Sequence, residues 1–355
     1  MTSGEEIPKA SERGRGAAVI LAALLALLLL SAIVTIGIGR YNLPPLKVSH
    51  ILLGMFFPST IPEIPPWRPV EWGIVTEVRM PRMLVTAFAG MGLGISGAAL
   101  QGLFRNPLVG PQIIGISSGA SFGGVLAILF SLPSFAVVGA AFSCGLLALF
   151  LVFLLSRLAN RSGSLSLVLA GIICSSFFAA LLGLAQYMAD PERQLPTMVY
   201  WLMGSFAAAD WRKVSVIAFP TIISGAFLML LRWRINLLSL GDEDASALGV
   251  KVGYLRWTIL VLVSLIVAAQ VSVSGGVGWV GLVTPHFARM MTGPDHRFLL
   301  PASALLGGSF LLVIDSLART LTMQEIPIGV LTALVGTPVF GYLFCRTRAR
   351  GWSHD

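Results

Sequence analysis

Charge is scarce in this chain of 355 residues, of which only 11% is Asp, Glu, Lys or Arg, against roughly a quarter of an ordinary soluble domain. Apolar runs of about 20 residues, long enough to cross a bilayer, recur along the sequence and leave no room for a separate soluble domain. The composition therefore predicts an all-α membrane protein. The net charge of +8 does not indicate a nucleic-acid partner, because the basic residues lie mainly at the ends of apolar runs and in short loops.

Residues that bind metals or attack substrates are also few. The three cysteines show no C-x-x-C spacing, and the four histidines are scattered without the spacing of metal ligands. The P-loop pattern G-x-x-x-x-G-K-[ST] is missing, and so is the nucleophile pattern G-x-S-x-G. We therefore predict no catalytic, cofactor or metal site in this chain.

Hydropathy, with Pro, Gly and charge as punctuation, predicts ten membrane spans. They lie near residues 17–39, 80–103, 112–130, 134–156, 165–189, 212–231, 254–273, 279–292, 298–319 and 328–345. The first run is longer than the core of a signal peptide, which has about 7 to 15 residues, so we expect it to be retained.

These spans divide the chain into three parts. Residues 1–16 are a polar N-terminal extension, residues 17–346 are the ten-helix domain and residues 347–355 are a tail. An even number of spans brings both termini to one side, and the excess of Lys and Arg on that side predicts that it is cytoplasmic.

Five basic residues break this rule between the first two spans: Arg40, Lys47, Arg68, Arg79 and Arg82. The same outer segment, residues 40–78, holds seven prolines, including those of "IPEIPPWRPVEW". Because proline favours extended backbone for itself and its predecessor, we expect an ordered or semi-rigid loop with two tryptophans at the membrane surface.

Small residues recur at helical spacing inside the spans. Gly90 and Gly94 lie four residues apart, and Gly115, Gly119 and Gly123 form two consecutive G-x-x-x-G steps. Such rows let helix backbones approach closely where no hydrophobic force drives their association. They predict helices that pack against each other.

One acidic residue, Asp315, lies inside a predicted span with Arg319 four residues later. On a helix the two side chains share a face and can pair. Two readings stay open from the residues alone: a structural ion pair, or a role for Arg319 at the outer surface.

Three consecutive acids occur in "LSLGDEDASALGV". Successive helical residues point about 100° apart, so these acids do not converge on one ion, and the alternating acids and glycine of a calcium loop are missing. A short helix fits better, because acids suit its first turn and Gly249 suits the C′ position after its end. We expect Ala245 and Leu248 to share a face and form an apolar spot.

Several stretches together resemble the permease subunits of ATP-binding cassette (ABC) importers for iron-siderophore complexes, haem and cobalamin. They are "RMPR", "SGAALQGLFRNPLVGPQIIGISSGA", "YWLMGSF", "NLLSLGDEDASALGV", "GWVGLVTPHFARMMTGPDHR" and "EIPIGVLTALVGTPVF", in collinear order from Val78 onward. The resemblance implies the type II importer architecture, with ten helices per chain. It also implies a second permease copy, two ATPase subunits that bind ATP and magnesium, and an extracytoplasmic substrate-binding protein.

The resemblance implies three sets of site residues. Binding-protein docking falls on Arg79, Arg82 and Arg319. Coupling to the ATPase falls on the segment 236–252, with Leu240, Gly241, Asp242, Glu243, Ala245, Leu248 and Gly249. The cytoplasmic gate falls on Asn106, Pro107, Leu108, Pro111, Ser162, Gly163 and Ser164.

We therefore expect the permease of a binding-protein-dependent importer in the cytoplasmic (inner) membrane of a bacterium or archaeon. It is not itself an enzyme, and its expected cargo is an iron chelate, a siderophore first. Haem and cobalamin are alternatives within the family. An ion-coupled secondary transporter is the rival from another class, although the spans offer little besides Asp315 for an ion relay.

Overall fold

Helices account for nearly all of the regular structure in the computed structural model, which describes residues 10–39, 41, 43–57, 67–158 and 163–348. The first half contains α1 (Ala10–Gly37), α2 (Pro45–Phe56), α3 (Pro69–Gly73), the π-helix η2 (Ile74–Arg79), α4 (Met80–Phe104), the 3₁₀ helix η3 (Pro111–Ile114), α5 (Ile116–Leu129), α6 (Ser134–Leu158) and α7 (Ser164–Met188). The second half contains α8 (Gln194–Leu202), α9 (Trp211–Leu238), α10 (Asp242–Ala247), α11 (Val252–Ser274), α12 (Val280–Thr292), α13 (His296–Thr320) and α14 (Ile328–Arg348). No strand occurs in this part of the chain.

Each predicted span coincides with a helix, but helix length does not confirm ten membrane crossings. Seven helical segments in the described ranges are long and apolar enough to span a bilayer. The segments that fall short are α5, the apolar part of α14 and α12, which has only 13 residues. The all-helical fold is confirmed, and the count of ten stays a prediction.

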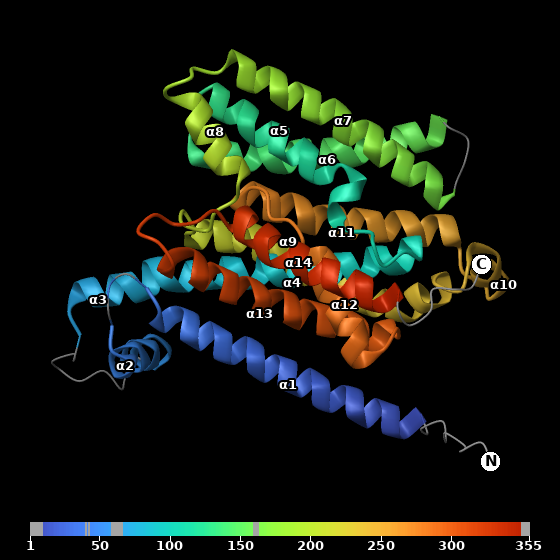
Figure 1. The fold of residues 1–355 in the computed structure, drawn as a ribbon, viewed down its shortest axis with the longest axis horizontal. Coiled ribbons are helices and arrows are strands. Elements are labelled where there is room, and N and C mark those ends of the chain that lie inside the picture. Colours follow the sequence, from blue (N-terminus) through green and yellow to red (C-terminus); the bar gives the residue numbers. More distant parts are fainter. Residues whose placement is uncertain (1–9, 40, 42, 58–66, 159–162, 349–355) are drawn as a thin grey trace.

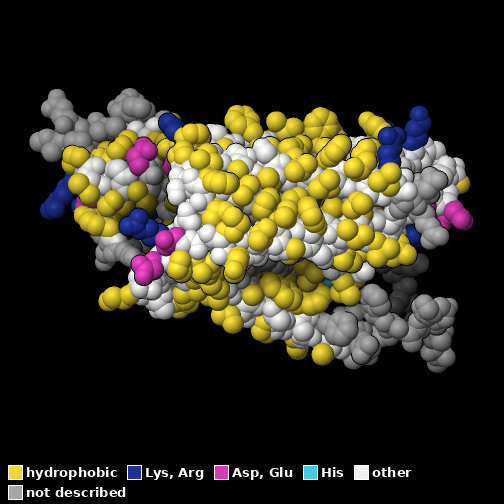
Figure 2. Space-filling model, turned by 90° about the horizontal axis from the view of Figure 1, so that it is seen from above, with side chains coloured by type: hydrophobic (Ala, Val, Ile, Leu, Met, Phe, Trp, Pro, Cys, Tyr) yellow, Lys and Arg dark blue, Asp and Glu magenta, His cyan; other side chains and the backbone are white. Residues whose placement is uncertain are grey.

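The long helices run roughly along the longest axis of the molecule (Figure 1). Helices α2 and α3 lie at one end, which we call the arginine end because it carries Arg79, Arg82 and Arg319. Helix α10 lies at the opposite end, which we call the α10 end, and there α1 begins and α14 ends. Figure 2 shows apolar side chains over the middle of the molecule and charged side chains towards its two ends, as a bilayer requires.

Three helices form the centre of the bundle. In the apolar 18-residue stretches of α4 and α11, 72% of the residues are buried, and in that of α13 67% are buried. In the corresponding stretches of α1, α6, α7 and α9, between 22 and 33% of the residues are buried. The outer helices therefore present most of their apolar side chains to the surroundings, as lipid-facing helices do.

Glycine explains how closely the central helices approach. A Cβ on Gly90 would overlap the carbonyl of Gly307, one on Gly94 would overlap the carbonyl of Ser303, and one on Gly97 would overlap the carbonyl of Gly281. Backbone therefore meets backbone where α4 crosses α13 and α12, which confirms the packing role expected for these small residues.

The outer segment is more helical than the ordered or semi-rigid loop that its prolines predicted. It contains α2 and α3, which begin with Pro45 and Pro69 at their first helical positions, where proline needs no N–H partner and its φ is already helical. Trp67 and Trp72 stack with their ring centroids 5.7 Å apart. The first half of "IPEIPPWRPVEW", residues 61–66, lies outside the described residues.

Candidate functional site

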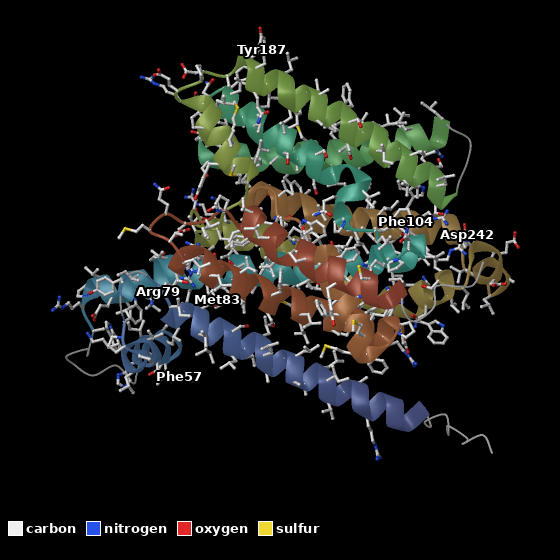
Figure 3. All side chains as sticks on the ribbon, in the orientation of Figure 1. Phe57, Arg79, Met83, Phe104, Tyr187 and Asp242 are labelled. Carbon is white, nitrogen blue, oxygen red and sulfur yellow. The ribbon has the colours of Figure 1, made fainter. Side chains whose placement is uncertain are left out.

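The first candidate site is the arginine cluster, formed by Arg79, Arg82 and Arg319. The π-helix η2 leads directly into α4, so that Arg79 ends the π-helix and Arg82 lies in the first turn of α4. Arg319 lies in the last turn of α13. The close packing of α4 on α13 brings the two helix ends together, and Figure 3 places Arg79 and Met83 at this end of the molecule.

Arg82 binds two carboxylates at once. Its Nε and Nη2 donate to Oδ1 of Asp315 at 3.0 and 2.9 Å, and its Nη1 and Nη2 each donate to Glu325 at 2.9 Å. Asp315 is fully buried, while the Glu325 side chain is 22% exposed. The planar guanidinium thus joins α4 to α13 and to the segment between α13 and α14.

The other two arginines bind the end of α1. Arg79 Nη1 donates to the carbonyls of Ile36 and Gly37 at 2.8 and 3.0 Å. Arg319 Nη2 donates to the carbonyl of Thr35 at 2.8 Å, and its Nε lies 3.3 Å from Oδ2 of Asp315. Basic side chains at a helix C-terminus satisfy its last carbonyls and suit its negative dipole end.

These contacts change how a docking role has to operate. The exposed fractions of Arg79, Arg82 and Arg319 are only 4, 7 and 7%, so the three do not form an open basic surface. The Asp315–Arg319 ion pair, one of the two readings that the residues left open, is present. Docking by the cluster stays a prediction, and it would require Arg82 to exchange Glu325 for an acid of the partner.

The second candidate site is the α10 segment, residues 236–252. Gly241 precedes α10 with φ of 135°, a value that L side chains rarely adopt. After the helix, Val250 N donates to the Ala245 carbonyl and Gly249 N donates to the Ser246 carbonyl. This pair of bonds is a Schellman motif, with Gly249 at φ 84° as its left-handed residue. The predicted short helix and its stop at Gly249 are confirmed.

One of the three acids of α10, Asp242, holds the helix to the bundle. Nη2 of Arg256, on α11, donates to both carboxylate oxygens of Asp242 at 3.0 and 2.8 Å. Glu243 and Asp244 are exposed, and no cluster of three or more His, Cys, Asp or Glu that could hold a metal occurs among the described residues. Asp242 therefore serves an ion pair, and the other two acids face solvent in the first turn of the helix.

The expected apolar spot has different members. Ala245 is fully buried, whereas Leu248 is 59% exposed, so the prediction that they share a face is wrong. Leu248 is the C-cap residue, with ψ of 11°, and its backbone has already left the helical course. The exposed apolar side chains are Leu240 and Leu248, each 59% exposed, on either side of α10.

The predicted gate residues lie on turns at two helix boundaries. Arg105 ends α4 in the left-handed conformation, and Leu108 N donates to Asn106 Oδ1 at 2.9 Å, which closes the turn around Pro107. Pro111 is buried, and its ring closely approaches Gly281.

The remaining gate residues begin α7. Gly163 is exposed and precedes the helix, Ser164 is half-buried in its first turn, and Ser162 lies outside the described residues. Helix η3 follows the first turn and packs against α7, the helix that begins at the second turn. A gating role for these residues stays a prediction.

The α10 segment lies beside the first of these turns. A Cβ on Gly241 would come within 3.3 Å of Arg105 Nη1, so the arginine lies against the glycine backbone. Figure 3 places Phe104, the last residue of α4, and Asp242 together at the α10 end. A displacement of α10 would therefore reach the end of α4 directly.

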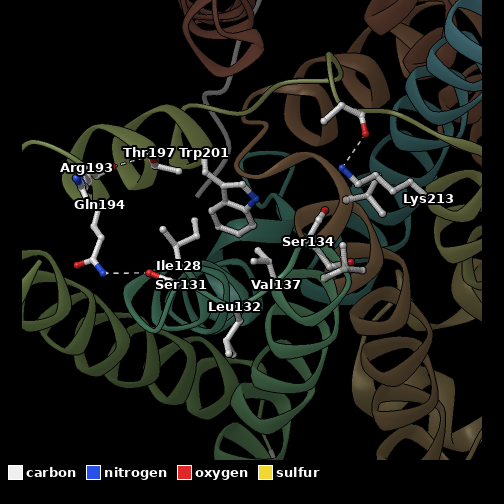
Figure 4. Close-up of a pocket in the computed structure, with 14 residues that line it drawn as sticks. Ile128, Ser131, Leu132, Ser134, Val137, Arg193, Gln194, Thr197, Trp201 and Lys213 are labelled. Atoms are coloured by element: carbon white, nitrogen blue, oxygen red, sulfur yellow. Dashed lines mark hydrogen bonds between the residues drawn. The ribbon is translucent and has the colours of Figure 1, made fainter. Parts of the chain in front are cut away.

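A pocket of about 420 Å³ at the arginine end was not foreseen from the sequence. It lies among α5, α6, α8, α9 and the end of α11, and Figure 4 shows Trp201 between Arg193 on one side and Lys213 on the other. Gln194 Nε2 donates to the Leu129 carbonyl at 2.7 Å, and Lys213 Nζ donates to the Ala208 carbonyl at 2.8 Å. These bonds hold α8 and the start of α9 in place. The signal in the sequence was Trp201 itself, within "YWLMGSF".

Comparison with known proteins shows the family of this chain. A family model described as the FecCD transport family matches residues 25–346. The chain belongs to the FecCD transport family. Its relatives are permease subunits, so this FecCD protein is a permease of the ABC importers.

The similarity to individual FecCD relatives extends over nearly the whole chain. The molybdate import system permease MolB of Haemophilus influenzae is 44% identical over 94% of this chain and 97% of its own length. The hemin transport permease HmuU of Yersinia pestis is 39% identical over 90% of this chain and 95% of its own. A solved chain assigned to the metal-chelate type of ABC transporters, in an inward-facing conformation, is 43% identical, with a TM-score of 0.83 over 93% of this chain and 99% of its own.

Proposed function

We propose that the two ends of this permease bind different partners. In the proposal a second permease copy completes the pathway, two ATPase subunits bind the α10 segments and an extracytoplasmic binding protein docks on the arginine end. The observation that carries it is the separation of the arginine cluster from α10, which lie at opposite ends of the same helices. Membership in an ABC importer family favours ATP over the ion gradient of a secondary transporter.

The contacts of the α10 segment would let it transmit a movement of the ATPase to the membrane helices. Asp242 is paired with Arg256 on α11, and the buried Ala245 seats α10 against the bundle, where it packs on α9 and α11. An ATPase that moves Leu240 and Leu248 would therefore move two long helices and the Arg105 turn together. A ligand shifts a conformational equilibrium only through a difference in affinity for its states, so ATP must hold α10 in another position than the nucleotide-free ATPase does. ATP and magnesium belong to the partner, and this chain makes and breaks no covalent bond.

For the cargo, we propose an iron chelate, a siderophore complex first. Haem and cobalamin are alternatives within the family. The similarity to a molybdate permease over 94% of this chain favours molybdate as a second candidate.

Uptake into proteoliposomes tests both parts of this proposal. The permease would be reconstituted with its ATPase and its binding protein, with ATP on the ATPase side, and offered a radiolabelled ferric siderophore, haem, cobalamin or molybdate. The proposal expects ATP-dependent uptake of the ferric siderophore. Uptake of molybdate alone would replace the cargo and keep the mechanism, whereas uptake driven by a proton or sodium gradient without ATPase would overturn the mechanism.

We further propose that the protein lies in the cytoplasmic (inner) membrane with the α10 end in the cytoplasm. Cys345, on α14, is the exposed one of the three cysteines. A membrane-impermeant maleimide is expected to label it in inside-out vesicles and not in sealed right-side-out ones. Labelling of the right-side-out vesicles would reverse the orientation.

A further inference from the structure

A groove of about 440 Å³ lies beside α10, between the end of α9 and the start of α11. Its rim carries two cations, Arg234 and Lys251, and two exposed aromatic side chains, Trp233 and Tyr254. Leu248, the exposed leucine at the end of α10, also lines it. The groove thus belongs to the surface of the bundle at the level where the helices end.

The charge of this groove is of one sign. Its lining contains no Asp or Glu within the described ranges. Neither Arg234 nor Lys251 has an ion-pair partner among those residues, where the six ion pairs involve other groups. A third cation, Arg297, stands 5.8 Å from the centre of the Trp233 ring, but Asp295 already neutralises it. Two uncompensated positive charges therefore face this space.

An apolar stripe leads from the groove along the membrane-facing side of α9. Its exposed side chains are Phe219, Ile222, Ile223, Phe227, Leu230 and Trp233. At 1.5 Å per residue this stripe is about 20 Å long, more than the roughly 15 Å of one hydrocarbon leaflet. It offers an acyl chain a continuous apolar surface that ends at the cations.

Aromatic side chains at such a position mark the membrane–water interface, since Trp and Tyr present an apolar ring and a polar tip. Trp233 and Tyr254 on neighbouring helices place the interface at the groove itself. Basic pockets between helices on the cytoplasmic side are where anionic lipid headgroups bind.

We propose that this groove, formed by Trp233, Arg234, Leu248, Lys251 and Tyr254, binds an anionic phospholipid. The phosphate and the charged headgroup contact Arg234 and Lys251, and an acyl chain lies along the stripe of α9. The bound headgroup lies next to the α10 segment. Binding itself does not depend on the proposed function, whereas any effect of the lipid on ATPase coupling does.

The test measures lipid preference on the full-length chain in nanodiscs of phosphatidylcholine. Brominated phosphatidylglycerol or brominated phosphatidylcholine is added, and the quenching of tryptophan fluorescence gives the relative binding constant. The Trp233→Phe variant identifies the part of the signal that comes from Trp233. We expect that part to show a clear preference for phosphatidylglycerol.

Charge removal then tests the two cations. A basic residue near an anionic membrane surface contributes about five-fold in affinity, so Arg234→Gln together with Lys251→Gln is expected to lower the preference by roughly 30-fold. Arg232→Gln is the matched control, because Arg232 is exposed, lies two residues before Arg234 on α9 and does not line the groove. Arg234→Lys with Lys251→Arg keeps both charges and is expected to keep the preference, which separates charge loss from misfolding.

Three results would overturn the proposal. An unchanged preference in the double Gln variant would show that the cations bind no headgroup. Loss of the quenching by brominated phosphatidylglycerol in millimolar inorganic phosphate would indicate a site for soluble anions. Loss of ATPase affinity in the double Gln variant, with lipid preference intact, would assign the groove to the ATPase.

Discussion

Replacing Arg82 by Met removes the guanidinium that holds two carboxylates at the arginine end while keeping most of the side chain's length. Asp315, which is fully buried, would keep only Arg319 as a counter-ion, at 3.3 Å. Glu325, whose side chain is 22% exposed, would turn towards water. The substitution therefore leaves one buried carboxylate with half of its former compensation.

The size of the effect follows from the burial of Asp315. Removing one partner of a buried ion pair costs about 3 to 5 kcal/mol, because the remaining charge stays desolvated. The remaining contact with Arg319 and the partial exposure of Glu325 place Arg82→Met near the lower limit, at about 3 kcal/mol. Adding Asp315→Asn removes the stranded carboxylate, and Arg319 keeps its hydrogen bonds to the carbonyls of Thr35 and Ile38. The double variant is therefore expected to recover about half of that loss.

Unfolding in mixed micelles with increasing dodecyl sulfate, followed by tryptophan fluorescence, measures these free energies. Arg212→Met is the control, because Arg212 is exposed at the start of α9, and it is expected to change stability by less than about 0.5 kcal/mol. The reasoning is refuted if Arg82→Met is as mild as this control, or if the double variant is less stable than Arg82→Met alone.

Three further substitutions test separate parts of the account. Glu325→Gln raises the net charge of the arginine cluster, which in the unmodified protein has three arginines against two carboxylates. The affinity for the binding protein at low salt should therefore rise, and its salt dependence should steepen. An unchanged affinity would contradict the idea that Arg82 exchanges Glu325 for an acid of the binding protein. Gly90→Ala forces α4 from α13 and should cost about 1 to 3 kcal/mol of unfolding free energy, whereas Gly139→Ala, with open space around it, should cost nothing. Gly249→Ala, at φ 84°, should cost about 1 kcal/mol of unfolding free energy, whereas Gly253→Ala, in helical backbone without close neighbours, should cost none. Equal losses in the two variants would contradict the assignment of Gly249 as the left-handed residue of a Schellman motif.

Local features of the fold were open to prediction from the sequence. The long apolar runs located the helices, because the length and polarity of a span are properties of one segment. The same holds for α10, whose acids, C′ glycine and flanking residues all lie within a few positions. The prediction of a loop in the outer segment failed for a local reason too. Proline favours extended backbone in loops but also occurs at the first position of helices, and Pro45 and Pro69 begin α2 and α3.

The partners of the site residues were not open to prediction in the same way. Asp315 and Arg319 could be paired from the sequence because they are four residues apart on one helix. Glu325 lies 243 positions from Arg82, and nothing local indicates their contact. The direction of Leu248 was missed because the C-cap leaves the helical course, so helical spacing from Ala245 no longer applies.

The central claim is that the α10 end binds the ATPase and the arginine end binds the binding protein, and Leu248→Glu tests it most directly. Binding of the ATPase and of the binding protein would be measured on the same nanodisc preparation, with Gly253→Ala, just beyond the α10 segment and without close neighbours, as the control. Loss of a buried apolar anchor at an interface costs about 2 to 4 kcal/mol, so ATPase affinity is expected to fall by roughly 30- to 1,000-fold. Binding-protein affinity, at a site far from the substitution, is expected to stay within about two-fold. Loss of binding-protein docking with full ATPase affinity would contradict the account.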